Sequence, residues 1–510
     1  MFKKARIDIL LVGAVILVCL AGIFTLYTQD IDANAPSYRW TKQLSFFLAG
    51  LIIMLIMRKV NYQLLGNISL PIYAVAIFLL LITLIPFIGS EIKGARSWIR
   101  IGPFGFQSSE FAKLPTVILL AKYLELKERD IEHITSLILP FTIFLIPMLL
   151  IVVQPDLGGA IIFAPILLAM LFVAGMDIYH ISSIFLFFGI SLSIPLYIEY
   201  NNIMLVDGLI SRLMDVGKDG LIPAVNILRS DIWNYLETGL LPTNVTGQDF
   251  DYLSRLHQNS PLFIEFQEIS NALRYDSGGF LLQILDTDWV VILLGSVFTL
   301  AALAMFIWRF TQGRSYHFLR KYYIPLGVIG LSILSASAIH NTFSFKYHQI
   351  VRVTAFINPD RFPRDLAYQI RASKVAVGSG QIVGKGMFAG EMTVGENPVV
   401  PEAFTDFIFT AWAERTGFLG SLVLIGLLLL IPLRGFQISL EARDKFGSQL
   451  AAGISFIFLF HIALNLGIEL GLMPVTGLPL SFVSYGGSHL IMCMTAVGIL
   501  LNIHHRKHAN

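Results

Sequence analysis

Asp406 is the residue of this sequence whose position best suits chemistry. It stands in the stretch Pro401 to Phe409, after a long polar segment and at the start of a long apolar one. An ionisable residue at a membrane boundary is costly to hold, so it is a candidate functional group. On the outer side of a membrane, a catalytic carboxylate could reach lipid-linked substrates but not cytoplasmic nucleotides.

Thr410 and Glu414 follow Asp406 at intervals of four residues, which predicts that the three side chains share one face of a helix. Charged groups in such helices turn towards the bundle interior rather than the lipid. An internal salt bridge is the structural alternative for these carboxylates. The polar segment before Asp406 favours the chemical interpretation.

That polar segment carries both cationic and acidic residues, among them Arg352, Lys374 and Glu402. Arg and Lys hold phosphate oxygens, so the segment suits a pyrophosphate-bearing substrate. A solvated loop without a ligand is the alternative. The glycines around Lys385 are interpreted as turns, because a phosphate-binding glycine loop needs a strand before it and a helix after it.

A second charged group comprises Arg96 in a predicted external loop, and Glu110 and Lys113 at the start of an apolar stretch. A lysine inside an apolar helix needs a partner or an anionic ligand, so Lys113 is the most informative of the three. The stretch Gln154 to Gly158 predicts a helical hairpin in which Asp156 caps the following helix.

Membrane-spanning helices must position these residues. Of the 510 residues, 55% are hydrophobic and 14% are charged, whereas soluble domains carry roughly 25% charged residues. The composition predicts an all-α polytopic membrane protein, and two cysteines give no disulfide framework. A span needs about 20 apolar residues. About twelve stretches qualify, the shorter ones with flanking residues: Ile9–Leu26, Leu44–Met57, Ile72–Ile88, Phe111–Leu124, Leu137–Val153, Gly158–Ala174, Ile181–Tyr197, Trp289–Phe310, Ile324–Ile339, Phe404–Leu433, Leu450–Leu470 and Leu490–Ile503.

The distribution of Lys and Arg predicts that both termini are cytoplasmic, because cationic residues then fall in the inner connections. The outer regions are 94–107, 154–157, 201–288 and 341–402. The corresponding domain ranges are 1–200 (seven helices), 201–288 (an inserted external segment), 289–340 (two helices), 341–402 (an external catalytic loop) and 403–510 (three helices and the tail). The Phe404–Leu433 run would be about 45 Å long as a helix, so it must tilt, bend near Gly417 or project from the bilayer.

Several motifs occur in an order that resembles a known family. They are Gly94 to Ile99, Ser109 to Lys113, Gln154 to Gly158, Ser373 to Gly380, Pro401 to Phe409 and Pro474 to Ser488. Together they resemble the shape, elongation, division and sporulation (SEDS) family of peptidoglycan polymerases. The likeness is closer to its RodA elongation branch than to its FtsW division branch.

The resemblance implies a ten-helix bundle, here enlarged by an insertion, in the bacterial cytoplasmic membrane. It implies polymerisation of lipid II at the outer face for cell elongation and shape, with Asp406 as the catalytic general base. Divalent Mg²⁺ or Mn²⁺ is the expected cofactor, and a class B penicillin-binding protein transpeptidase is the expected partner. Candidate substrate-binding residues are Arg96, Glu110, Lys113, Arg352, Lys374, Glu402 and Glu414.

Two other functions stay open at this point. A lipid II flippase would suit twelve helices with buried charges, although its charged groups should lead through the membrane rather than gather on one side. A scaffold of the cell-wall synthesis complex would tolerate loss of the Asp406 carboxylate. The 201–288 insertion is expected to bind a partner or position the enzyme, and its deletion should spare folding and basal polymerisation.

Overall fold

The computed structural model describes residues 8–32, 38–92, 95–101, 104–127, 134–215, 217, 287–312, 320–342, 366–394 and 399–507, with short pieces between 222 and 285 and at 356–357. The chain forms two compact units. Unit 1 comprises Met1–Ile178 and Ala355–Asn510, and unit 2 comprises Tyr179–Thr354. The domain ranges drawn from the sequence divide instead at 200 and 340, and they stay a prediction.

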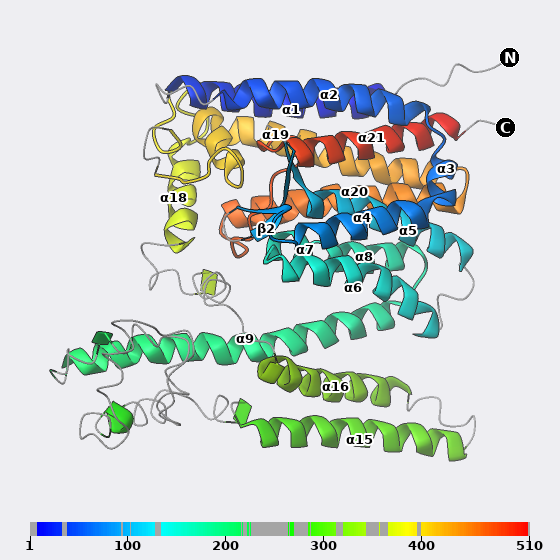
Figure 1. The fold of residues 1–510 in the computed structure, drawn as a ribbon, viewed down its shortest axis with the longest axis vertical. Helices are drawn as coiled ribbons and strands as arrows, with labels where there is room; N and C mark the ends of the chain where they lie inside the picture. Colours follow the sequence, from blue (N-terminus) through cyan, green and yellow to red (C-terminus); the bar gives the residue numbers. More distant parts are fainter. Residues whose placement is uncertain are drawn as a thin grey trace. The chain divides into compact units, whose positions relative to one another are not determined.

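Unit 1 is a bundle of roughly antiparallel helices (Figure 1). Its long helices are α1 (Ile9–Asp32), α2 (Arg39–Lys59), α4 (Ser69–Thr83), α5 (Ser108–Leu126), α6 (Ile138–Val153), α8 (Phe163–Val173), α18 (Leu366–Ser379), α19 (Ile408–Glu441), α20 (Lys445–Glu469) and α21 (Gly487–Arg506). The short elements are α3 (Tyr62–Asn67), the 3₁₀-helix η1 (Ile134–Leu137) and α7 (Leu157–Ile161). Most residues of α20 and α21 are buried, so these two helices form the centre of the bundle.

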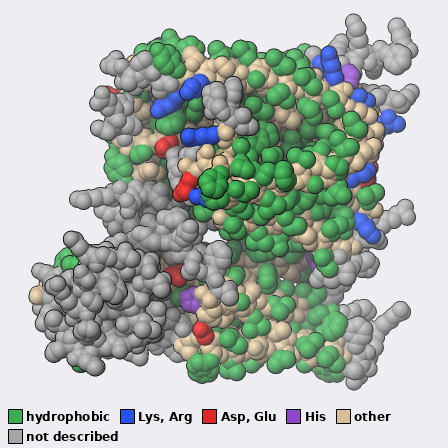
Figure 2. Space-filling model, in the orientation of Figure 1, with side chains coloured by type: hydrophobic (Ala, Val, Ile, Leu, Met, Phe, Trp, Pro, Cys, Tyr) green, Lys and Arg blue, Asp and Glu red, His purple; other side chains and the backbone are tan. Residues whose placement is uncertain are grey.

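The predicted all-α polytopic membrane fold is confirmed. Among the described residues, eight helices are long and apolar enough to span a membrane, and three shorter apolar helices accompany them. Each of the twelve predicted stretches contains a helix. Hydrophobic side chains form a broad band between the two ends of unit 1 (Figure 2). Residues such as Leu48, Ile52 and Leu55 of α2 are at least half exposed, as expected of a surface that faces lipid.

One end of unit 1 gathers the start of α1 and the ends of α19 and α21. There Asp8 pairs with Arg434 at 2.6 Å, and Glu441 pairs with Lys507 at 2.9 Å. The other end carries α18 and the β-sheet. The cationic tail therefore lies at the end opposite the sheet. This agrees with the prediction that the tail and the 94–107 loop lie on opposite sides of the membrane.

The predicted external loop at 94–107 contains most of a small sheet. Strands β1 (Gly89–Ile92), β2 (Ala95–Ile101) and β3 (Phe104–Gln107) are antiparallel in that order. Trp98 is opposite Gln107 in the register. The main-chain N–H of Gln107 donates to Ser488 Oγ at 3.2 Å, so the sheet is joined to the start of α21. Such short strands offer little periodicity, which is why the sequence suggested only a loop.

Unit 2 is built from α9 (Ile178–Asp215), α15 (Asp288–Gln312) and α16 (Arg320–Thr342). Helices α15 and α16 pack backbone to backbone, because a Cβ placed on Gly330 would lie 2.6 Å from the main-chain nitrogen of Thr299. Ser191 Oγ of α9 lies 2.5 Å from Ser335 Oγ of α16. Helix α9 continues to Asp215, inside the predicted external segment, and most of the rest of that segment lies outside the described residues.

Candidate active site

Asp406 lies in a turn and not in a helix. Helix α19 begins at Ile408, and Phe407 before it has non-helical dihedral angles (φ −121°, ψ 33°). The predicted helical face shared by Asp406, Thr410 and Glu414 is therefore wrong, since Asp406 precedes the helix. Of the three alternatives for the long run, the structure shows a bend near Gly417, which interrupts α19 with φ 66° and ψ −164°.

Hydrogen bonds from distant parts of the chain hold the main chain of this turn. Each of the four successive carbonyl groups from 403 to 406 accepts a hydrogen bond. The donors are, in order, Gln29 Nε2 at 3.2 Å, the main-chain N–H of Tyr485 at 3.0 Å, Ser484 Oγ at 2.6 Å and Asn465 Nδ2 at 3.0 Å. Because α1, α20 and the segment before α21 supply these donors, the turn has a fixed place, which a catalytic side chain needs.

Helix α18, which was expected to be loop, packs beside the turn. Ile370 and Ala376 of α18 belong to one buried cluster with Phe407, Ala411 and Ile468. The helix that carries the exposed residue Lys374 thus lies beside the Asp406 turn.

The segment after α20, residues 471–477, passes close to both Lys374 and Asp406. A Cβ on Gly471, which has φ +68°, would lie 2.4 Å from Lys374 Nζ, so the lysine extends across this glycine. A Cβ on Gly477 would lie 3.7 Å from Asp406 Oδ2. Lys374 and the half-buried Asp406 are therefore two ionisable side chains along one segment of backbone.

Glu414 holds a loop. Its buried carboxylate accepts hydrogen bonds from Lys385 Nζ (3.1 Å), from the main-chain N–H groups of Glu391 (3.1 Å) and Met392 (3.0 Å), and from Thr393 Oγ1 (2.8 Å). The glycines beside Lys385 do form turns, with positive φ at Gly384 and Gly386. Hydrogen bonds to Glu391 and then Glu414 raise the pKa of Lys385 above its ordinary value. Contact between Glu414 and substrate stays a prediction.

Glu110 and Lys113 form a buried ionic network between α5, α20 and α21. Lys113 Nζ lies 2.5 Å from Glu110 Oε1 and 3.0 Å from His461 Nε2. Glu110 Oε2 lies 2.5 Å from His489 Nδ1. The expectation that Lys113 needs a partner is confirmed, and the partner is a side chain of the protein itself.

The remaining candidate residues have separate surroundings. Arg96 is partly exposed, 3.6 Å from Glu91, a distance and exposure typical of a weak ion pair. Glu402 has φ 56°, and its carboxylate accepts a hydrogen bond from Thr405 Oγ1 at 3.2 Å. Arg352 lies outside the described residues. The predicted cap at Asp156 is confirmed by its hydrogen bond from the Gly159 N–H at 2.9 Å.

A resident divalent cation needs several ligand side chains close together. In the described part of the chain, the group with suitable ligand spacing is Glu110, His461 and His489, whose ligand atoms lie within 4.8 Å of one another. Mg²⁺ prefers oxygen ligands, and the Lys113 ammonium already contacts two members of this group. The group of Glu110, His461 and His489 therefore does not suit a resident Mg²⁺ ion.

The comparisons with known proteins decide the family. A family model described as "Cell cycle protein" (FtsW, RodA and SpoVE) matches residues 5–221 and 288–509. The chain belongs to this family. The match resumes at 288, so α15 lies inside it. The unmatched segment is thus 222–287, which lies within the 201–288 segment that the sequence suggested as an insertion.

Relatives from both branches of the family match nearly the whole chain. The peptidoglycan glycosyltransferase RodA of Treponema pallidum is 27% identical over 502 residues and covers 98% of each chain. A probable peptidoglycan glycosyltransferase FtsW of Trichlorobacter lovleyi is 26% identical over 508 residues, covering 98% of this chain and 94% of the relative. The peptidoglycan glycosyltransferase MrdB of Escherichia coli K12 is 40% identical, but over 184 residues, 35% of this chain and 49% of the relative.

Solved structures share the fold. A chain from a peptidoglycan synthase complex, reported for the coordination of polymerisation and crosslinking, matches with a TM-score of 0.58 at 22% identity. The rod shape determining protein RodA of Thermus thermophilus matches with a TM-score of 0.52 at 20% identity. Both alignments cover 99% of each chain. The family fold therefore extends through this chain.

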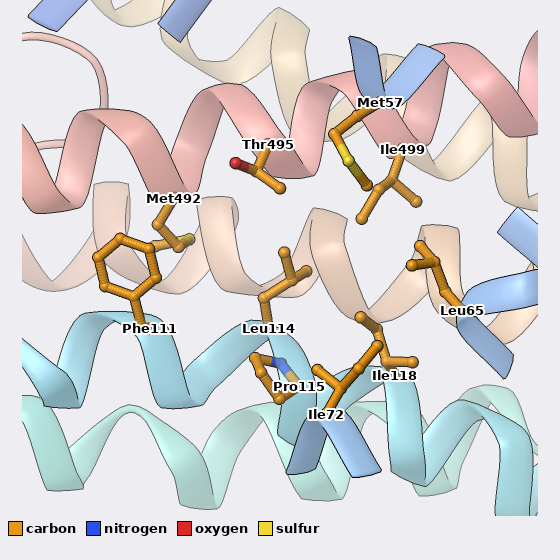
Figure 3. A pocket seen from close by; sticks show the side chains of 10 residues that line it. All are labelled: Met57, Leu65, Ile72, Phe111, Leu114, Pro115, Ile118, Met492, Thr495 and Ile499. Atoms are coloured by element: carbon orange, nitrogen blue, oxygen red, sulfur yellow. The ribbon is translucent and has the colours of Figure 1, made fainter. Parts of the chain in front are cut away.

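This family member also has an apolar cavity of about 200 Å³ between α2, α3, α4, α5 and α21 (Figure 3). Its lining comprises Met57, Leu65, Ile72, Phe111, Leu114, Pro115, Ile118, Met492, Thr495 and Ile499. The one hydroxyl among them, that of Thr495, donates to the Ile491 carbonyl at 2.7 Å. Such a lining suits a hydrocarbon chain and not a phosphate.

The sequence interpretation missed several residues that build the site, above all His461, Asn465 and Glu469. They recur every four residues along α20, so they share one face of an otherwise apolar helix. All three are fully buried. Polar residues at this spacing within a predicted span were the signal that could have revealed them.

Proposed function

We propose that this chain polymerises lipid II into glycan strands at the outer face of the bacterial cytoplasmic membrane, in the service of cell elongation. Membership of the family and near full-length similarity to named peptidoglycan glycosyltransferases support the proposal. The structural observation that carries it is the Asp406 turn, held by hydrogen bonds at all four carbonyls from 403 to 406. A fixed main chain at Asp406 keeps its carboxylate in one place for proton transfer, as a general base requires.

In the proposed reaction, the Asp406 carboxylate acts as the general base. It takes the proton of the acceptor's GlcNAc 4-hydroxyl as that oxygen attacks the anomeric carbon of the donor glycan. The new glycosidic C–O bond forms while the bond from the anomeric carbon to pyrophosphate breaks. The electron pair leaves with undecaprenyl pyrophosphate, and the proton stays on Asp406 until it passes to solvent.

The leaving pyrophosphate needs positive charge beside it. Lys374 is the described residue best placed for this role, because it is exposed and extends across Gly471 on the segment that also passes Asp406. An ammonium group there would stabilise the charge that develops on the phosphate oxygens. Arg352 is proposed for the same role from its place in the sequence alone.

A cation requirement and a transpeptidase partner are proposed separately. Because the group of Glu110, His461 and His489 does not suit Mg²⁺, the proposed steps are assigned to side chains of the protein. A dependence on Mg²⁺ or Mn²⁺ would be tested by adding EDTA to the polymerisation assay. The similar chain in a solved peptidoglycan synthase complex supports a class B penicillin-binding protein as partner.

Polymerisation of labelled lipid II by the purified protein tests the proposal, with the cognate transpeptidase and Mg²⁺ present. Asp406→Asn keeps the shape of the side chain but removes its basicity, so we expect polymer to fall at least about 10²-fold. Glu441→Gln is the control, because it changes an acidic residue near the far end of α19.

Three outcomes distinguish the functions. Polymer from wild type and from Glu441→Gln, but not from Asp406→Asn, supports the glycosyltransferase. Equal polymer from all three proteins removes Asp406 from the mechanism. Absence of polymer from the wild type, even with the partner, overturns the proposal in favour of transport or a scaffold role. The assay in detergent has no membrane sides, so transport cannot imitate polymer formation.

A further inference from the structure

A buried glutamate from α20 caps the helix that follows Asp406. Glu469 Oε2 accepts hydrogen bonds from the main-chain N–H of Thr410 at 2.5 Å and from its Oγ1 at 2.7 Å. Glu469 Oε1 accepts from the Phe409 N–H at 3.3 Å. These N–H groups belong to the first turn of α19, where no helical carbonyl is available to them. A carboxylate at a helix N-terminus is also favoured by the helix dipole.

The same contact reaches α18. Ser373 Oγ lies 2.6 Å from Thr410 Oγ1 and donates to the main-chain carbonyl of Glu469 at 2.8 Å. Ser373 precedes Lys374, the cation proposed for the leaving group. The three side chains of Ser373, Thr410 and Glu469 are fully buried and join α18, α19 and α20 at one point.

Helix α20 contacts the main chain at Asp406 and again three and four residues after it. Asn465, one helical turn before Glu469, donates to the carbonyl of Asp406 at 3.0 Å. Glu469 accepts from the amides three and four residues later. Both contacts hold the main chain that directly follows the Asp406 Cα atom, so the direction of the Asp406 side chain depends on both anchors.

We propose that Glu469 is a positioning residue that fixes Asp406 and α18 for glycan polymerisation. This inference rests on the proposed function of Asp406. Glu469 is fully buried, so it acts on the reaction through the main chain of α19. Without its carboxylate the amides of Phe409 and Thr410 lose their acceptor, and the turn can relax. A displacement of about 1 Å at a reacting group can cost 10²-fold in rate.

The test compares Glu469→Ala and Glu469→Gln with Asp444→Ala. Asp444 caps α20 at the opposite end of the bundle, where its carboxylate accepts from the Gly447 N–H at 2.7 Å and from Tyr62 Oη. Both alanine variants therefore remove a capping carboxylate, but only one cap holds the Asp406 turn. Each protein is assayed for kcat and KM with lipid II and for thermal unfolding in detergent.

We expect Glu469→Ala to lower kcat about 10²-fold with KM within about threefold of wild type. Glu469→Gln keeps one acceptor oxygen, so its kcat should be at least about tenfold higher than that of Glu469→Ala. Asp444→Ala should lower thermal stability yet keep kcat near wild type. Equal losses of kcat in both alanine variants, or an unchanged kcat in Glu469→Ala, would overturn the inference.

Hydrogen–deuterium exchange separates this inference from the proposed function. Amides 409 and 410 should exchange at least about tenfold faster in Glu469→Ala than in wild type. In Asp444→Ala their exchange rates should equal those of wild type. Unchanged exchange in Glu469→Ala overturns the anchoring whether or not polymer forms. If the wild type makes no polymer, the proposed function fails, and this exchange result alone decides whether Glu469 holds the turn.

Discussion

Glu110 Oε2 lies 2.5 Å from His489 Nδ1, although 379 positions separate the two residues in the chain. With its other oxygen, Glu110 contacts Lys113 Nζ. One carboxylate thus holds α5 against α21 inside the bundle. Buried charged groups are tolerated only when each is paired, so each member of the network depends on the others.

Removing one member of this network should be more harmful than removing the pair. Glu110→Ala leaves the Lys113 ammonium buried beside His461, and we expect a loss of about 3–5 kcal/mol in stability. The double variant Glu110→Gln with Lys113→Met removes both charges and should recover part of that loss. Thermal unfolding in detergent measures the difference. A Glu110→Ala protein as stable as wild type would contradict this assignment.

Gly417 should tolerate no side chain. Its φ is +66°, and a Cβ there would lie 2.3 Å from the main-chain nitrogen of Gly384 and 2.7 Å from the carbonyl oxygen of Ile382. Gly417→Ala is expected to displace the 382–384 segment and to lower stability by more than about 1 kcal/mol.

Gly426 is the matched control for this prediction. It lies in the same helix, and a Cβ there would meet nothing within 4 Å. Gly426→Ala should be neutral or slightly stabilising, since alanine favours a helix over glycine by about 1 kcal/mol. Equal unfolding temperatures for the two alanine variants would show that the close approach at Gly417 is not constraining.

The 385–393 loop, which Glu414 holds, should lose its fixed conformation at alkaline pH. Because hydrogen bonds to Glu391 and Glu414 raise the pKa of Lys385 above its ordinary 10.5, its contribution is complete below pH 10.5. That contribution disappears as the pH rises through the higher folded value. Limited proteolysis of the 385–393 loop should therefore be constant from pH 7 to 9 and increase above about 10.5. In Lys385→Met the cleavage should lack this alkaline rise; a rise of the same size would assign it to another group.

Asn465 should be sensitive to a change of donor into acceptor. Its Nδ2 donates to the carbonyls of Asp406 (3.0 Å) and Leu478 (2.8 Å). Asn465→Ala leaves these carbonyls without their donor, at a cost of about 1–3 kcal/mol. Asn465→Asp places a carboxylate against both oxygens and should be more harmful to stability and to polymerisation. Unfolding temperature and polymer yield measure both effects, and an aspartate variant that equals wild type would contradict the assignment.

The sequence by itself determined the membrane fold and several local features. Continuous apolar stretches located every predicted span, because hydropathy and length are properties of the stretch itself. The cap at Asp156, the bend at Gly417 and the need of Lys113 for a partner followed from residue types alone. The order of motifs was enough to identify the family.

Only the tertiary structure decided how the site is built. Residues 404–407 begin a run that hydropathy predicts as helix. The carbonyls of 404, 405 and 406 instead accept from Tyr485, Ser484 and Asn465, so a turn replaces the helix. Glu414 likewise serves a loop that hydropathy cannot locate. Local patterns report which stretches are apolar or helical, whereas hydrogen-bond partners hundreds of residues apart become neighbours only when the helices pack.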